Sequence, residues 1–195
     1  MKRKIILMAV IIGIVSILSA GTLAFFTAEE KATNVITSGN VEILLEEWTD
    51  QVDEAGNQIP YKEEYGVMPG TSVSKIVQVK NTGGADAYIR MKVDVILELE
   101  EEVERDADAG LISMDFNTSK WTQSEEGYYY YNVALKPGDT TEPLFSKVTF
   151  GKEMGNDYQN SSATVEVKAF AVQKANNGAT VFEAAGWPED STFEN

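Results

Sequence analysis

The densest run of side chains able to bind a metal is the acidic stretch ELEEEVERDADAG at residues 98–110. Carboxylate oxygens are the ligands that a hard cation such as Ca²⁺ prefers. The DADAG part, however, lacks the regular ligand spacing and the terminal Glu of a calcium loop. We therefore interpret the stretch as a solvated charged segment, a short helix or loop inserted between strands, with calcium binding as the alternative.

Four consecutive tyrosines, Tyr128–Tyr131, form the largest run of aromatic side chains in the sequence. Such a surface could stack on a sugar or contact another protein. In a strand, two of the rings would point to each face, and packing with cross-strand pairing explains them more simply. We expect a structural role, and a surface-binding module remains the alternative.

The composition removes most catalytic mechanisms, because the sequence contains no His and no Cys. Ser-His-Asp and Cys-His nucleophiles, thiolate metal sites and the H-E-x-x-H zinc site cannot be built without them. There is no glycine-rich phosphate loop, and no spacing singles out a pair of catalytic carboxylates. We predict that the chain is not an enzyme and has no catalytic residues, metal ligands or cofactor.

The charge balance narrows the choice of partners. The net charge is −15, and removing the first 24 residues, with Lys2, Arg3 and Lys4, changes the balance from 16 − 31 to 13 − 31, or −18. So acidic a protein is repelled by phosphate backbones and anionic lipid headgroups. We expect no nucleic-acid partner, and cations or basic surfaces suit the protein better.

The elements that position these residues are strands, since most of the chain shows a period of two. In AYIRMKVDVILEL, residues 87–99, the apolar side chains of Ile89, Met91 and Val93 alternate with polar ones, which predicts one buried and one largely solvated face. Further strands are predicted at 41–46, 73–79, 128–135, 144–150 and 164–173. Six or more short strands favour an antiparallel sandwich or barrel.

Three connections have a recognisable turn chemistry. MPGTS at 68–72 and KPGDT at 136–140 place Pro before Gly, which predicts type II turns ahead of the following strands. NTGGAD at 81–86 predicts a hairpin between its flanking strands. A short helix is expected around residues 181–185.

The amino terminus is typical of an export signal. Three basic residues precede a 14-residue apolar run, residues 5–18, broken only by Gly13 and Ser16. Small residues at Thr22 and Ala24 place the cut of signal peptidase after Ala24, so that Phe25 becomes the new N-terminus. The alternative is an uncleaved anchor, because residues 5–26 are long enough to span a bilayer.

The order of several segments resembles the TasA and camelysin family of exported Gram-positive proteins. GTLAFFT and NVITSGNVEI follow the apolar run, and VMPGTSVSKIVQVKNTGGADAYIRMKV and ATVEVKAFAVQ come later. The resemblance implies cleavage by a dedicated ER-type signal peptidase, the SipW type. It also implies a jelly-roll sandwich and a role like that of the biofilm-matrix fibre subunit, whose N-terminal segment completes the sheet of a neighbouring copy. The metallopeptidase label of the camelysin branch conflicts with the absence of His.

These observations give one expectation for the whole chain: residues 1–24 are a signal-peptide helix, 25–40 an extended segment, and 41–195 an all-β, jelly-roll-like sandwich. We expect an extracellular structural protein that polymerises with itself by strand exchange, alone or with a fibre accessory protein. The assembly segment would contain Phe25, Phe26, Val35 and Ile36, with the two aromatic rings as anchors. The alternative is that residues 25–38 fold back as an edge strand of their own domain.

Overall fold

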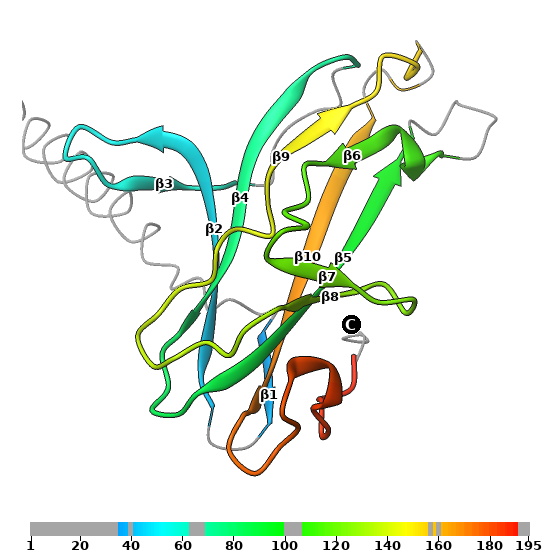
Figure 1. Ribbon diagram of the computed structural model, residues 1–195. Coiled ribbons are helices and arrows are strands. Elements are labelled where there is room, and N and C mark those ends of the chain that lie inside the picture. Colours follow the sequence, from blue (N-terminus) through cyan, green and yellow to red (C-terminus); the bar gives the residue numbers. More distant parts are fainter. Residues whose placement is uncertain are drawn as a thin grey trace, which may run out of the picture. The chain divides into compact units, whose positions relative to one another are not determined.

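The computed structural model describes residues 35–38, 41–62, 69–99, 107–155, 158 and 161–190 (Figure 1). All of them belong to one unit, residues 34–195. This unit is all-β and contains two five-stranded sheets that face each other as in a β-sandwich, so the predicted fold class is confirmed at this level. The predicted signal peptide lies outside the described residues.

The first sheet, sheet A, has the strand order β1-β10-β5-β8-β7. Its central pair is the long antiparallel ladder between β10 and β5, which runs from Ser162 beside Glu98 to Gln173 beside Ala87. Strand β1 is parallel to β10, and the other pairs are antiparallel. The bounds are β1 Val35–Ser38, β10 Ser162–Gln173, β5 Ala87–Glu98, β8 Tyr128–Tyr131 and β7 Trp121–Gln123.

The second sheet, sheet B, is antiparallel throughout and has the order β3-β2-β4-β9-β6. In Figure 1, β2 and β4 run side by side and then separate, so that β3 lies next to the end of β2. The bounds are β3 Gln58–Pro60, β2 Ile43–Val52, β4 Ser72–Asn81, β9 Phe145–Phe150 and β6 Ile112–Met114. Two short 3-10 helices, η1 Ala109–Leu111 and η3 Val181–Glu183, lie outside the sheets.

The core lies between the sheets and consists mainly of alternate residues of β4, β5, β9 and β10. Ile89 and Met91 of β5 are fully buried, as the period of two predicts. The prediction that the other face of β5 is solvated is wrong for the first residues of the strand, because Tyr88 and Arg90 are also buried. Chain from beyond β10 covers that face: Tyr88 and Val172 pack in one cluster with Val181.

Both predicted Pro-Gly turns place glycine in the left-handed region, with φ of +74° at Gly70 and +83° at Gly138. The second turn is closed by a hydrogen bond of 3.1 Å from the Asp139 amide to the Lys136 carbonyl. The helix expected around 181–185 is the 3-10 helix η3, where the Thr180 amide donates to Glu183 Oε2 at 3.2 Å.

The predicted hairpin at residues 81–86 is wrong, because β4 belongs to sheet B and β5 to sheet A. The connection crosses between sheets. Asn81 stabilises the crossing by donating from Nδ2 to the carbonyls of Ala85 and Leu135, both at 2.9 Å. A Cβ at Gly83 would lie 2.7 Å from the Glu42 amide nitrogen, so glycine lets the connection pass close to the segment before β2.

Other strand limits differ from the prediction. Strand β2 continues to Val52, because its second half pairs with β3 rather than β4. Strand β8 ends at Tyr131, and Leu135 forms only an isolated bridge with Ala87. Strands β3, β6 and β7 were not predicted, and each has only three residues.

Candidate assembly edge of sheet A

Strand β1 is the edge strand of sheet A and contains Val35 and Ile36 of the predicted assembly segment. Its four residues pair in parallel with Ala169–Val172, with Val35 beside Ala169. For residues 35–38, the structure therefore shows pairing within the chain, the alternative that the sequence left open. Ala24, Phe25 and Phe26 lie outside the described residues, so cleavage after Ala24 and aromatic anchoring stay predictions.

Beyond β1, the edge of β10 from Ser162 to Lys168 pairs only with β5 in the part of the chain that the structure describes. The Lys174 amide donates to the Asp86 carbonyl across the β10–β5 ladder at 2.9 Å. Backbone groups alternate in direction along an antiparallel strand, so those of Val165 and Val167 point away from β5, toward the open edge. Such an edge is a template for adding a strand.

Lys75 is a buried cation that contacts the backbone at this edge. Lys75 of β4 has no exposed surface, and its Nζ donates to the Val165 carbonyl at 2.9 Å from the opposite sheet. The same Nζ lies 3.1 Å from Glu47 Oε1 and 4.3 Å from the centre of the Tyr61 ring. An inward-pointing lysine that caps edge carbonyls is a recognised way to protect an open strand. Lys75 was not among the site residues predicted from the sequence.

The tyrosine strand β8 is built into the fold, with two rings on each face as predicted. Tyr129 stacks on Phe116 with ring centres 4.4 Å apart, and Tyr131 contacts Trp121 at 4.9 Å. On the other face, Tyr128 lies against Arg90, whose Cζ is 3.9 Å from the ring centre. Burial raises the pKa of Tyr129. These contacts favour the structural role over the ligand-binding alternative.

The acidic stretch is described only in part, because residues 100–106 lie outside the described residues. Asp108 precedes η1, and its Oδ1 accepts from the Gly110 amide at 2.9 Å. Within the described ranges, no three Asp or Glu side chains gather in a way that could hold a metal ion. Calcium binding by the stretch therefore stays a prediction to be tested.

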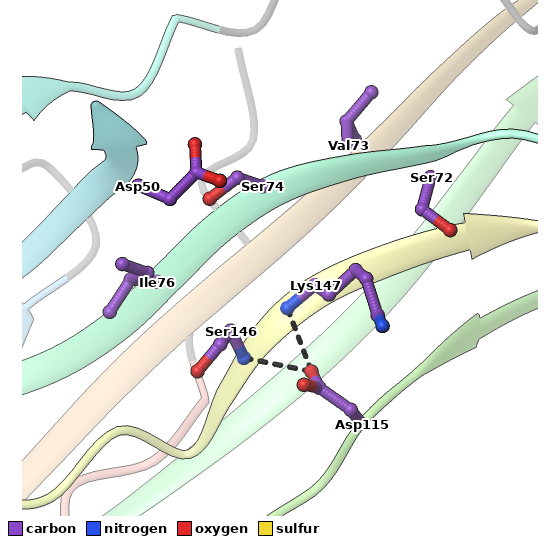
Figure 2. Close-up of a pocket in the computed structure, with 8 residues that line it drawn as sticks. All are labelled: Asp50, Ser72, Val73, Ser74, Ile76, Asp115, Ser146 and Lys147. Atoms are coloured by element: carbon purple, nitrogen blue, oxygen red, sulfur yellow. Dashed lines mark hydrogen bonds between the residues drawn. The ribbon is translucent and has the colours of Figure 1, made fainter.

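A groove opens on sheet B where β2 and β4 separate beyond the pair Trp48–Ile76. Its two overlapping parts have volumes of about 340 and 480 Å³ and share the side chains of Asp50 and Ser72–Ser74. Figure 2 shows Asp115 in hydrogen bonds with the backbone of Ser146 and Lys147, at 2.8 and 2.7 Å. This carboxylate holds the β9 backbone.

No protein-family model matches the chain, and no curated protein matches it. The likeness to the TasA and camelysin family therefore stands on the sequence segments alone. Among the described residues, no helix has the length and apolar character needed to cross a bilayer.

Proposed function

We propose that this chain is an exported structural protein of the cell surface or extracellular matrix, and that its copies join by exchanging the N-terminal segment 25–38. The fold would be a jelly-roll-like sandwich, which agrees with connections such as that from β4 to β5 that cross between sheets. Signal peptidase would release the chain after Ala24, and a fibre accessory protein could start the assembly. The proposal includes no enzymatic activity.

The observation that carries the proposal is that β1 is a short, parallel edge strand at the start of the domain. It fills only the part of the β10 edge at Ala169–Val172. A terminal edge strand is the element most easily exchanged, because the same backbone hydrogen bonds form within one copy or between two. Exchange therefore needs no new interface chemistry.

The register of β1 also predicts where a longer donor would lie. Val35 pairs with Ala169, an offset of 169 − 35 = 134 residues. A donor segment continuing in that register would place residues 28–34 beside the open edge Ser162–Lys168, since 28 + 134 = 162 and 34 + 134 = 168. Phe25 and Phe26 would then lie beyond Ser162, at the end of the ladder where Leu97 of β5, opposite Ala163, is only half-buried.

Strong negative charge makes cations part of the proposal. With a charge of −18 after the cut, 13 − 31, copies repel each other at low salt. We expect calcium or moderate salt to promote assembly. Equally complete assembly at low ionic strength with a chelator would argue against a cation requirement.

The first test is negative-stain electron microscopy of the chain that begins at Phe25, with and without calcium, beside a chain that begins at Asn40. The longer chain should form fibres, whereas the shorter chain should stay folded by circular dichroism and form none. Fibres from both chains would refute the role of the N-terminal segment. The other outcome is that both chains stay monomeric in all conditions, even when cell extract is added as a source of accessory protein. That result would favour a monomeric surface-binding module.

A second test separates exchange from pairing within one chain. The sequence has no Cys, so Ala32→Cys with Glu166→Cys introduces one defined pair, at 32 + 134 = 166. Oxidation should give covalent ladders on a non-reducing gel, and Ala32→Cys alone should not give them. Cross-linking only within monomers at every protein concentration would refute exchange in this register.

A further inference from the structure

The outer face of sheet A has a cation pair that needs an anion. In the β5–β10 ladder, Lys92 lies directly opposite Lys168, and Arg90 lies opposite Phe170. Like charges directly opposite each other on neighbouring strands are destabilising unless an acid lies between them. Asp94 and Glu166, the next opposed pair, lie on the same face and compensate part of this charge.

The anion that contacts both lysines comes from the C-terminal segment. Asp190 Oδ2 lies 2.8 Å from Lys92 Nζ, and Asp190 Oδ1 lies 3.1 Å from Lys168 Nζ. The hydrogen bond that Lys92 donates lowers the pKa of Asp190, and the hydrogen bond that each lysine donates to Asp190 raises the pKa of that lysine. All three side chains thus stay charged over the physiological range.

Two further contacts of the segment involve Arg90. This guanidinium is sandwiched by aromatic rings, with Cζ 3.9 Å from the Tyr128 ring centre and 4.7 Å from that of Trp187. Its Nη2 donates to the Pro188 carbonyl at 3.3 Å. The Arg90 residue is 8% exposed, yet its Nε has no hydrogen-bond partner among the described residues. The face therefore recognises a ring, a carbonyl and a carboxylate within four residues.

When the last part of the segment leaves this face, it loses two contacts with the loop before it: a hydrogen bond of 3.0 Å from Trp187 Nε1 to the Ala184 carbonyl, and the packing of Trp187 in the cluster with Val181. Asn177 ties the loop together by donating to the carbonyls of Gln173 and Ala185, both at 3.1 Å, and Val181 is buried in a cluster with Tyr88. Gly186 follows with φ of +73°, and residues 187–190 then cross the face. Gly186 is thus a natural pivot between the anchored loop and the docked residues.

We propose that the outer face of sheet A is a recognition site for the segment Trp187–Asp190, filled by the chain's own segment in the isolated molecule and by that of a second copy in assemblies. The site does not rest on exchange of the N-terminal strand. Tethering gives the chain's own segment an effective concentration of about 1 mM. A second copy competes where the protein is as concentrated as that, as it is within a matrix.

Two complementary variants of the full-length chain test the proposal. The acceptor, Trp187→Ala with Asp190→Asn, has a vacant face, and the donor, Lys92→Gln with Lys168→Gln, has an undocked segment. In analytical ultracentrifugation, each alone should sediment as the native chain does, and their mixture should gain a species with the mass of a 1:1 dimer at about 100 µM protein in about 0.15 M salt. In the matched control, the acceptor is mixed with the variant Lys120→Gln instead of the donor, because this substitution removes only the exposed ion pair with Glu142. A mixture that sediments as the two variants do alone, although both are folded, overturns the proposal.

A peptide measurement keeps the test decisive if either double variant fails to fold. A labelled peptide of residues 186–195 is titrated into the native chain and into the single variant Asp190→Asn. Because the native segment competes for the face, the peptide should bind the variant at least about tenfold more tightly. Equal binding to both chains, or binding to neither, overturns the recognition site.

Discussion

The substitution Lys75→Met tests the buried cation at the edge of β10. It removes a fully buried ammonium group and keeps an unbranched apolar side chain. Glu47 loses a cationic partner at 3.1 Å, and the Val165 carbonyl loses a donor at 2.9 Å. The variant should therefore be less stable, although it is more hydrophobic.

The magnitude follows from the exposure of the partner. Removing one member of a buried ion pair destabilises a protein by about 3–5 kcal/mol. The Glu47 side chain keeps 24% of its surface exposed, so water solvates part of its charge and the lower end applies. The lost carbonyl contact adds about 1 kcal/mol, and the new apolar burial offsets about as much. We expect the free energy of unfolding to fall by about 3 kcal/mol, which lowers a urea midpoint by about 1.5 M.

Urea unfolding followed by tryptophan fluorescence measures this loss, with Lys147→Met as the control because Lys147 is exposed on β9. The double variant Lys75→Met with Glu47→Leu removes both charges of this pair, so it should recover more than about 1 kcal/mol of the loss. A single-variant loss below about 1 kcal/mol, or a double variant that shows no recovery, would refute the reasoning.

The same variant has a second readout that depends on the proposed function. If strands add at the edge of β10, a chain without the Lys75 contact to the Val165 carbonyl should assemble faster and with a shorter lag. An unchanged lag together with the expected loss of stability would mean that Lys75 stabilises the sandwich but does not protect its edge.

Three further predictions test the fold. Gly83→Ala should lower the free energy of unfolding in urea by about 2 kcal/mol, because its Cβ would lie 2.7 Å from the Glu42 amide nitrogen. The control Gly84→Ala meets no atom within 4 Å, so its free energy of unfolding should change little. Equal effects of the two substitutions would contradict the close passage of the β4–β5 connection beside Glu42. The hydrogen bond from Lys92 lowers the pKa of Asp190, so the stability advantage of the native chain over Asp190→Asn should hold at neutral pH. That advantage should begin to decline in calorimetry as the pH falls below the ordinary pKa of an Asp carboxyl, about 4, and should be lost once the pH falls through the lowered pKa of Asp190; an advantage that does not decline in acid would count against the ion pairs. Burial raises the pKa of Tyr129, so Tyr129→Phe should remove a late-ionising tyrosine from the alkaline absorbance titration, and an identical titration curve would argue against its burial.

The central strands could be predicted because their side chains alternate over many residues. The 12 residues each of β5 and β10 show this most clearly. Strands of three residues, such as β3, β6 and β7, are too short for alternation to be distinguished from loop sequence. The glycines of NTGGAD predicted a hairpin, and this prediction is wrong because local sequence does not specify to which sheet the next strand belongs.

The face of β5 that looked solvated was mispredicted for a different reason. Arg90 and Lys92 are ordinary surface residues by type, and the segment that covers them lies 98 residues further along the chain. Alternation reports which residues share a face, but it does not report what lies over that face. A Trp-Pro-x-Asp sequence so far from β5 gave no signal of docking on it.

Lys75, in contrast, could have been found from the alternation alone. In SVSKIVQVK, Lys75 shares the period-two positions of Val77 and Val79, which are buried, so its side chain must point between the sheets. Glu47 has the same phase as Ile43 and Leu45 on the neighbouring strand. Glu47 pairs with Val77, so it lies diagonally beside Lys75, within reach of long side chains. Opposite charges at buried positions of two adjacent strands predict an internal ion pair. The third partner, the Val165 carbonyl, belongs to the other sheet, so only the structure could identify it.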